Sequence, residues 1–362
     1  MSQFTLQPDL YKTGSATDLF EVLSDVWPKK PDSAEDYFVV SGFGSFNGGV
    51  SFYERFRALT ATGRHVTAVF GGSRSTNQTS RQLTDALLDC GVDVHIVNRR
   101  YMMHSKLYGA KADDGKQKLV ITSGNFTGPG IARNVESTLA LTSDLTSKVN
   151  FDWDGVMAGL LHSGLDVFTL NSATEDDPRW NLLYDEGSRD SRKPTPEDNQ
   201  DILESLIVTL GHADTARIQA ARGTDEGKGS QYFWLSTDSY SFFPPLTIRN
   251  RRGRKATYSC LINVNFVSLS EQSEVRVTFE AENNRDFRLG TGRLRHTGAA
   301  SAGDLAVLSR RGEYDYELRI VPAGTSQYFK LSAYATAFIG AQGKRYGYAP
   351  NSVVDRALKG VN

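Results

Sequence analysis

The sequence has little cysteine and no long hydrophobic run. Of its 362 residues only Cys90 and Cys260 are cysteines, and both lie in apolar stretches far apart in the chain. Buried thiols explain them better than a disulfide, a metal site or a nucleophile does, so a reducing compartment is expected. No apolar run approaches the roughly 20 residues that cross a bilayer. The first twelve residues are too mixed and polar for a signal peptide. These absences predict a cytoplasmic protein with no membrane partner.

The length and composition fit two globular domains. A chain of 362 residues suits two domains of roughly 150–200 residues each. The net charge of −1 is unevenly divided, because residues 202–362 carry 21 Lys or Arg and 15 Asp or Glu, which gives +6 there and −7 in the remainder. Such an asymmetry favours a polyanion as the partner of the C-terminal part, although six excess charges can also be ordinary surface.

The first half alternates between strand-like and helix-like patterns, which predicts an α/β sheet with parallel neighbours. A hairpin is expected where two apolar runs bracket the polar turn 111–116. The predicted strands are 37–41, 65–70 and 92–97, the predicted helices 52–59 and 81–90, and the hairpin strands 106–109 and 118–122.

The glycine-rich stretch 42–49 lacks both the Lys-Ser/Thr of a P-loop and the glycine spacing of a dinucleotide fingerprint. A turn that shapes the mouth of a site is therefore expected there. Between 171 and 201 the sequence is acidic and rich in turn-forming residues, which predicts a linker that is ordered in part by Trp180 and residues 182–184 docking on an apolar surface. From 202 onward, short strands separated by turns favour a compact β barrel or sandwich.

One group of residues carries the chemistry of phosphodiester cleavage. His104 and Lys106 are two apart, so they are expected on the same face of a strand. Ser123 and Asn125 end the next apolar run, and Glu136 follows. A neutral imidazole can attack phosphorus, while Lys, Asn and a Ser hydroxyl can bind the oxygens that carry negative charge. A carboxylate such as Glu136 can accept a ring N–H and fix the tautomer.

His-x-Lys followed by Ser-x-Asn resembles the motif of the phospholipase D superfamily. That resemblance implies a two-step reaction through a covalent phosphohistidine at His104, with no divalent metal or other cofactor. The family needs two such motifs in each active site, one histidine attacking and the other protonating the leaving oxygen. Of the six histidines only His104 is followed by x-Lys. The resemblance therefore implies a homodimer whose composite active site lies at the two-fold interface, with His104 of the partner subunit as the general acid.

The sequence departs from the superfamily pattern at one position. The family often has an Asp five residues after the lysine, where this chain has Lys111. Asp113 and Asp114 are near but fall in the expected turn, so that role is not assigned to them. Glu136 is the better carboxylate, and its context, residues 123–130 leading to 134–136, resembles the compact nuclease branch of the superfamily.

The whole chain is similar to the BfiI-type restriction endonucleases. The stretches that carry the similarity are 41–43, 46–49, 104–109, 123–130, 180–186, 211–219, 243–250, 279–283 and 344–348. The resemblance implies three parts: a phospholipase D-like nuclease and dimerisation domain at 1–170 (a mixed sheet flanked by helices), the acidic linker 171–201, and a B3-like DNA-binding domain at 202–362, a seven-stranded pseudobarrel.

The same similarity implies a function and its partners. It implies a bacterial site-specific deoxyribonuclease of type IIS-like character, which cuts double-stranded DNA at a fixed distance from an asymmetric site. A companion DNA methyltransferase acting on the same site is implied as well.

The B3-like resemblance also indicates how DNA is read, through two arms that enter the major groove. The first arm is expected to follow strand 206–211 and reach Gly229, and the second to lie around 276–288. Paired hydrogen bonds to base edges and contacts to phosphates need Arg, Lys, Asn or Gln. The expected DNA contacts are Arg217, Gln219, Lys228, Ser230, Trp234, Arg251, Arg252, Arg254, Arg276, Asn283, Arg285, Arg288, Lys344 and Arg345.

Several alternatives stay open at this point. Trp234 also fits a protein core, and the run 251–255 also fits a solvated turn. The acidic linker is either a plain tether or a segment that lies near the active site and hinders DNA entry. At the level of the whole protein, a phospholipase or phosphatidyltransferase of the same superfamily is disfavoured by the single His-x-Lys motif and the basic C-terminal part. A non-catalytic DNA-binding regulator is disfavoured by the intact set of candidate catalytic residues.

Overall fold

The computed structural model describes residues 3–7, 19–29, 35–98, 102–162, 167–172, 174, 176–187, 203–252, 255–281, 286–339 and 343–359. The chain divides into two compact units. The first comprises Met1–Lys12 and Ala16–Lys193, and the second Thr13–Ser15 and Pro194–Asn362. The main boundary therefore falls inside the segment that the sequence predicts as a linker. None of the described helices is long and apolar enough to span a membrane.

An eight-stranded mixed sheet forms the centre of the first unit, in the order β1-β7-β6-β5-β2-β3-β4-β8. The strands β2, β3 and β4 run parallel, whereas β5 is antiparallel to β2 and begins a run of antiparallel strands through β6 and β7 to β1. The strands are β1 (Gln3–Gln7), β2 (Glu35–Ser41), β3 (Val66–Gly71), β4 (Asp93–Val97), β5 (Lys106–Ala112), β6 (Gln117–Thr122), β7 (Glu136–Leu141) and β8 (Val167–Thr169).

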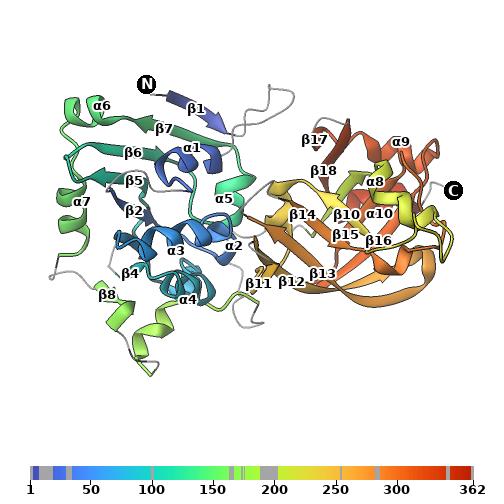
Figure 1. Ribbon diagram of the computed structural model, residues 1–362, viewed down its shortest axis with the longest axis horizontal. Coiled ribbons are helices and arrows are strands. Elements are labelled where there is room, and N and C mark those ends of the chain that lie inside the picture. Colours follow the sequence, from blue (N-terminus) through green and yellow to red (C-terminus); the bar gives the residue numbers. More distant parts are fainter. Residues whose placement is uncertain are drawn as a thin grey trace. The chain divides into compact units, whose positions relative to one another are not determined.

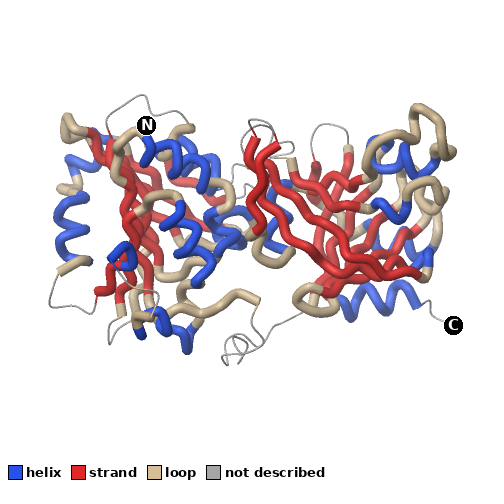
Figure 2. The backbone as a smooth tube through the Cα atoms, turned by 60° about the horizontal axis from the view of Figure 1, so that its bottom comes forward, coloured by secondary structure: helices blue, strands red, loops and turns tan. Residues whose placement is uncertain are grey.

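Helices cover both faces of this sheet, as Figure 2 shows. In Figure 1, α1, α3 and α5 lie over one face, and α7 lies beyond the other. The helices are α1 (Leu19–Val26), α2 (Phe46–Gly49), α3 (Tyr53–Ala61), α4 (Arg81–Asp89), α5 (Gly128–Ala132), α6 (Ser143–Lys148) and α7 (Trp153–Leu160), with short 3-10 turns η1 (Arg74–Thr76), η2 (Leu170–Ser172) and η3 (Pro178–Leu182). The predicted α/β class, strands, helices and hairpin of this part are confirmed.

Two aromatic groups hold the layers together. On one face, the buried Trp27 indole lies edge-on to Phe52, Phe56 and Tyr108, with ring centroids 5.1 to 5.7 Å apart. On the other, Trp153 at the start of α7 stacks on Phe38 of β2 at 4.7 Å. Burial of such large apolar side chains is the main favourable term in folding. It fixes the sheet on which the site residues stand.

The second unit is mainly β, as predicted. Ten strands form one sheet, in the order β10-β14-β13-β12-β16-β15-β9-β18-β17, with β11 paired to β12 off this path. Ten strands exceed the seven that the B3-like resemblance implies. They are β9 (Glu204–Thr209), β10 (Tyr232–Leu235), β11 (Ile248–Arg252), β12 (Lys255–Phe266), β13 (Glu271–Glu280), β14 (Phe287–Gly290), β15 (Leu305–Arg310), β16 (Asp315–Val321), β17 (Ala337–Ile339) and β18 (Lys344–Pro350).

The ends of this sheet approach each other, so it forms a nearly closed barrel. Lys344 of β18 donates from Nζ to the backbone oxygen of Trp234 in β10 at 2.5 Å. The same Nζ lies 2.7 Å from the carboxylate of Asp214. Helices α8 (His212–Gln219), α9 (Ser326–Ser332) and α10 (Asn351–Lys359) accompany the barrel, with 3-10 turns η5 (Thr237–Phe242), η6 (Val267–Leu269) and η7 (Gly292–Leu294).

Candidate active site and DNA-binding face

His104 and Lys106 lie side by side at the N-terminal end of β5. The sequence predicted both on one strand, but β5 begins at Lys106, so His104 lies in the irregular segment before it. Their side chains nevertheless meet, with Lys106 Nζ 3.1 Å from Nδ1 and 3.0 Å from Nε2 of His104. The same Nζ donates to the His104 backbone oxygen at 3.1 Å. The lysine is buried and the imidazole is exposed, which leaves the ring open to a substrate.

The backbone beside His104 requires a glycine at position 42. The Gly42 N–H donates to the Ser105 oxygen at 2.9 Å. A Cβ at Gly42 would lie 2.5 Å from the Met103 oxygen and 3.0 Å from the His104 Cα. Contacts this short are forbidden to ordinary side chains, so the close approach needs glycine. Residues 41–43, which are among the stretches that carry the resemblance to BfiI-type enzymes, thus hold the histidine segment in place.

Ser123 and Glu136 form a second pair, between the end of β6 and the start of β7. The Ser123 hydroxyl donates to Glu136 Oε2 and accepts the Ser137 N–H at 3.0 Å. The Glu136 side chain is buried. Glu136 was expected to accept a ring N–H of His104, but among the described residues no hydrogen bond joins them. The carboxylate instead fixes the serine at the start of the Ser-Gly-Asn turn.

The Asn125 side chain stands in the same turn. Its Oδ1 atom is buried and has no hydrogen-bond partner among the described residues. Two hydrogen bonds from the neighbouring strands hold the turn. The Tyr108 hydroxyl donates to the Gly124 oxygen at 2.9 Å, and Phe126 N donates to Ser41 Oγ at 3.0 Å. A rigid turn that carries an unsatisfied amide is a suitable place for a polar substrate group.

The electrostatics of the pair favour a neutral histidine. Partial burial, and then the neighbouring Lys106 charge, lower the pKa of His104. Burial also lowers the pKa of Lys106, while the negative charge of Glu136 opposes that shift. A neutral imidazole has one nitrogen with a free lone pair, which is the form that a nucleophile needs.

Lys111, which stands where the superfamily often has an acid, plays no part in this group. It lies near the other end of β5, where it pairs with Asp152 at 3.2 Å and also with Asp154. Among the described residues, no three His, Cys, Asp or Glu side chains gather in a way that could hold a metal ion.

In the second unit, basic and aromatic side chains share one face of the sheet. Trp234 of β10 is paired with Arg288 of β14, and Arg288 in turn with Thr278 of β13. The Arg288 guanidinium carbon lies 5.1 Å from the ring centroid of Tyr232 and 6.0 Å from that of Trp234. Arg276 lies on the same face, since residues two apart on a strand point the same way. It donates to Ser259 Oγ at 2.8 Å.

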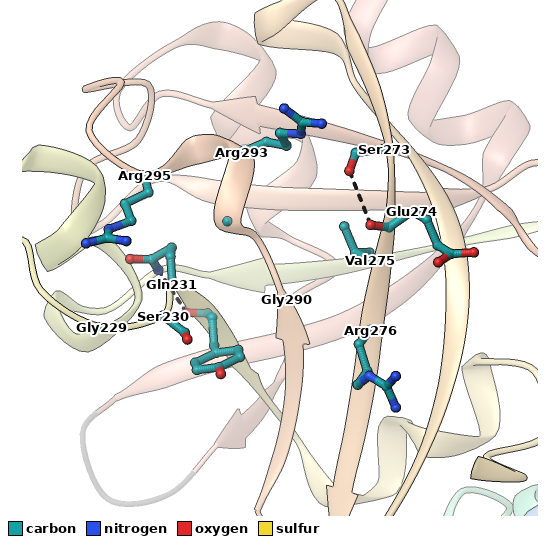
Figure 3. Close-up of a pocket in the computed structure, with 12 residues that line it drawn as sticks. Gly229, Ser230, Gln231, Ser273, Glu274, Val275, Arg276, Gly290, Arg293 and Arg295 are labelled. Carbon is teal, nitrogen blue, oxygen red and sulfur yellow. Dashed lines mark hydrogen bonds between the residues drawn. The ribbon is translucent and has the colours of Figure 1, made fainter.

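This face is hollowed over the end of β14, where Gly290 and Gly292 carry no side chains. The hollow has a volume of about 530 Å³. Figure 3 shows residues 229–231 on one side of Gly290 and residues 273–276 on the other, together with Arg293 and Arg295. Tyr232 and Gly292 also line the hollow. Three arginines against one carboxylate, that of Glu274, make its lining positive, which suits an anionic partner.

Comparison with known families identifies this unit. Residues 198–361 match the family described as the DNA-binding domain of the metal-independent restriction enzyme BfiI. The match covers nearly the whole C-terminal unit, so this unit is similar to the BfiI DNA-binding domain. The resemblance to BfiI-type enzymes, and double-stranded DNA as a partner, are thereby confirmed.

Solved structures similar to this chain are remote. Nuc from Salmonella typhimurium, a phospholipase D family member, is 17% identical over 41% of this chain and 89% of its own, with a TM-score of 0.29. NucT from Helicobacter pylori is 15% identical over 45% and 96%, with a TM-score of 0.34. The yeast tyrosyl-DNA phosphodiesterase is 14% identical over 39% and 32%, with a TM-score of 0.27. No curated protein sequence matches this chain significantly.

The BfiI-type domain places the predicted DNA contacts in different settings. Arg276, Arg288, Ser230 and the half-buried Trp234 stand at or beside the hollow. Arg251 is exposed at the tip of the β11–β12 hairpin. The Arg345 guanidinium stacks on Phe338 at 4.8 Å. Arg254, Asn283, Arg285 and the side chain of Arg252 lie outside the described residues.

Four other predicted contacts of this domain, like Arg276, already have protein partners. Lys344 is in the buried ion pair with Asp214, which a DNA contact would have to break. Gln219 donates to the Ala300 oxygen at 2.6 Å, and Arg217 to the Lys228 oxygen at 2.6 Å. Lys228 pairs with Asp225 at 2.6 Å, but both are exposed. An exposed pair of this kind is weak and can open.

Sequence reasoning missed Tyr232, Arg293 and Arg295, which all line the hollow. The signal was present in Gly290-x-Gly292 followed by Arg-x-Arg, since glycines at a strand end often mark a close approach by another molecule.

The described part of the predicted linker packs on the first unit. Leu183 is buried, and the Arg81 guanidinium carbon lies 5.2 Å from the Trp180 ring centroid. Glu186 Oε1 accepts the Phe46 N–H at 2.6 Å, in the glycine-rich stretch that also holds Gly42. The predicted docking of this segment is confirmed, and one of its acids reaches the loop that shapes the histidine segment.

Proposed function

We propose that this protein is a metal-independent restriction endonuclease that cleaves double-stranded DNA at a fixed distance from an asymmetric recognition site. The observation that carries the proposal is the exposed imidazole of His104 beside the buried Lys106 ammonium, in a chain whose other unit is similar to the BfiI DNA-binding domain. Reading and cutting then reside in separate units, which explains cleavage outside the recognised bases.

In the first step, the unprotonated ring nitrogen of His104 attacks phosphorus. A phosphorus–nitrogen bond forms, the bond from phosphorus to the leaving deoxyribose oxygen breaks, and the partner subunit's His104 supplies the proton that this oxygen needs. In the second step, water attacks phosphorus and the phosphorus–nitrogen bond breaks. The partner subunit's imidazole, now neutral, takes the proton from that water. The atoms balance without any metal ion.

Lys106 and Asn125 bind the non-bridging oxygens of the phosphate. The Lys106 ammonium already points its donors at the ring that will hold the phosphoryl group. Asn125 would donate to a phosphate oxygen from its amide nitrogen Nδ2, because its oxygen Oδ1 can only accept. Donors fixed in advance stabilise the charge of the transition state more than mobile ones do. Glu136 acts through Ser123, whose position it fixes at the start of the turn that presents Asn125.

Exposed apolar residues support the dimer that this mechanism needs. Met102, Ile121 and Val135 are 54%, 41% and 51% exposed. Each lies within two residues of a proposed catalytic residue, namely His104, Ser123 and Glu136 respectively. Apolar side chains of this size at a surface commonly mark an interface. A second copy of the chain would cover them and bring the second His104 to the site.

The proposal is tested with purified protein and plasmid DNA in excess EDTA. Discrete fragments are expected, whereas no cleavage with or without added divalent metal would contradict the proposal. Sedimentation analysis should give a dimer, and Ile121→Asp should shift it toward monomer with a parallel loss of cleavage. Phosphatidylcholine vesicles in place of DNA test the phospholipase alternative, and release of headgroup would favour it.

A further inference from the structure

The loop between α8 and β10, Ala220–Ser230, carries two of the proposed DNA contacts, Lys228 and Ser230. Its ends turn sharply, with positive φ at Gly223 (86°) and Gly229 (92°). It contains no helix or strand. A segment of this kind owes its shape to side chains that reach it from outside.

Three such side chains donate to its backbone oxygens. Arg295 donates to the Gly227 oxygen from Nε at 2.9 Å and also from Nη2. Arg217 donates to the Lys228 oxygen at 2.6 Å. The Nδ1 of His296 lies 2.7 Å from the Ala220 oxygen, and because a carbonyl can only accept, this nitrogen carries the proton.

The contact between Arg295 and the loop is closely packed. Gly227 is buried, and a Cβ there would lie 2.8 Å from both the Ala221 oxygen and the His296 Cε1. His296, which follows Arg295 in the sequence, has a left-handed φ of 64°, which few non-glycine residues adopt. The turn is held to α8 by the bond from His296 N to the Arg217 oxygen at 2.9 Å. The loop and the turn therefore fix each other.

We propose that Arg295 is a positioning residue for DNA recognition: its guanidinium fork holds the loop Ala220–Ser230 in the shape that presents Lys228 and Ser230 to the bases and phosphates. This rests on the proposed function, since it assumes sequence-selective binding. Two nitrogens of Arg295 are committed to the Gly227 oxygen. The neighbouring Arg293 is exposed, and within the described part of the chain its one ion pair is the distant one to Glu271 at 3.9 Å. Arg295 thus supplies geometry, and Arg293 supplies charge.

Binding by full-length variants tests this division. All variants are made in the His104→Ala protein, which should bind DNA without cutting it. Two duplexes serve as probes. The first is selected from a random library by His104→Ala itself, and the second is a scrambled duplex of the same composition. Arg295→Gln should lower the ratio of specific to scrambled affinity about tenfold and leave the salt dependence unchanged. Arg293→Gln, the matched control, should weaken both duplexes alike and reduce the salt slope by about one.

Arg295→Lys separates geometry from charge, because an ammonium cannot reproduce the two-donor fork. It should behave like Arg295→Gln. Wild-type behaviour of Arg295→Lys, an unchanged affinity ratio in Arg295→Gln, or a reduced salt slope in Arg295→Gln would each overturn the proposal.

Hydrogen exchange without DNA tests the restraint itself. Amides of residues 221–230 should exchange faster in both Arg295 variants at unchanged melting temperature, and unchanged exchange would overturn the proposal. If the parent protein shows no preference between the two duplexes, the proposed function fails, and the exchange experiment still decides whether Arg295 holds the loop.

Discussion

Lys106 Nζ lies 3.0 Å from Nε2 and 3.1 Å from Nδ1 of His104. An ammonium has only donors, so a hydrogen bond between the two groups requires an imidazole nitrogen without a proton. The lysine therefore favours the neutral ring, in addition to its proposed role of binding the phosphate. The partner subunit's His104 must carry a proton at the same moment. The two histidines of the proposed site thus work in different protonation states.

Replacement of the nucleophile should separate cutting from reading. His104→Ala should abolish cleavage in EDTA and leave specific DNA binding intact, as measured by gel shift and plasmid digestion in parallel. The control is His65→Ala, which removes an exposed histidine 4.0 Å from Asp93. Full cleavage by His104→Ala would refute the proposed mechanism.

The pH dependence of cleavage should respond to Lys106. The folded-state pKa of His104 lies below its ordinary value, so the attacking ring stays neutral somewhat below pH 6.5 and activity is lost as the pH falls through that pKa. Lys106→Met removes the positive charge, so the pKa of His104 should rise. The acidic limb of the pH profile of kcat/KM should then shift to higher pH.

The same Lys106→Met variant should lower kcat about 10²- to 10³-fold, because a charged donor to the phosphate is lost. Lys116→Met, which removes an exposed lysine paired with Asp114, is the control. It should change neither the acidic limb of the pH profile nor kcat. An unmoved acidic limb in Lys106→Met would show that the lysine does not set the protonation of His104.

Ser123 and Glu136 should behave as one unit. Ser123→Ala and Glu136→Gln should each reduce cleavage, and the double variant should lose little more than the worse single one, since each acts through the same hydrogen bond. Independent, multiplicative losses in this double-mutant cycle would instead mean that Glu136 contacts a reacting group directly.

The cation–aromatic cluster should carry sequence-selective affinity. If Arg288 reads a base, Arg288→Ala should cost roughly 1–3 kcal/mol in specific binding. The substitution also removes the guanidinium that covers the rings of Tyr232 and Trp234. Arg356→Ala, a substitution in α10 at the end of the chain, is the control. Equal losses on specific and scrambled duplexes would make Arg288 a phosphate contact.

The acidic linker hypothesis now has a specific residue to test. Glu186 accepts the Phe46 N–H, next to the glycine turn that holds the His104 segment. If the linker hinders DNA entry, Asp185→Asn with Glu186→Gln should raise cleavage of non-specific DNA. Unchanged non-specific cleavage would leave the linker a plain tether.

Much of the fold could be predicted from local patterns. The alternation of apolar runs predicted β2, β3 and β4, and the turn 111–116 predicted the β5–β6 hairpin. What the patterns could not predict was which atoms meet across distant segments. Glu136 was assigned to His104 on residue type, whereas its buried carboxylate contacts Ser123. Lys344 was assigned to DNA as part of a basic pair, but the closing barrel brings it to Asp214.

The close approach of Gly42 to His104 also constrains how the protein is made. The two segments meet because β2 and β5 pair, with Ser41 opposite Lys106, although β3 and β4 are synthesised between them. Contacts between residues so far apart in sequence form late in folding. The Glu136 carboxylate joins from a still later strand. A chain that ends before β7 therefore lacks Glu136 and the hydrogen bond that fixes Ser123, so the proposed site can assemble only after that strand has been synthesised.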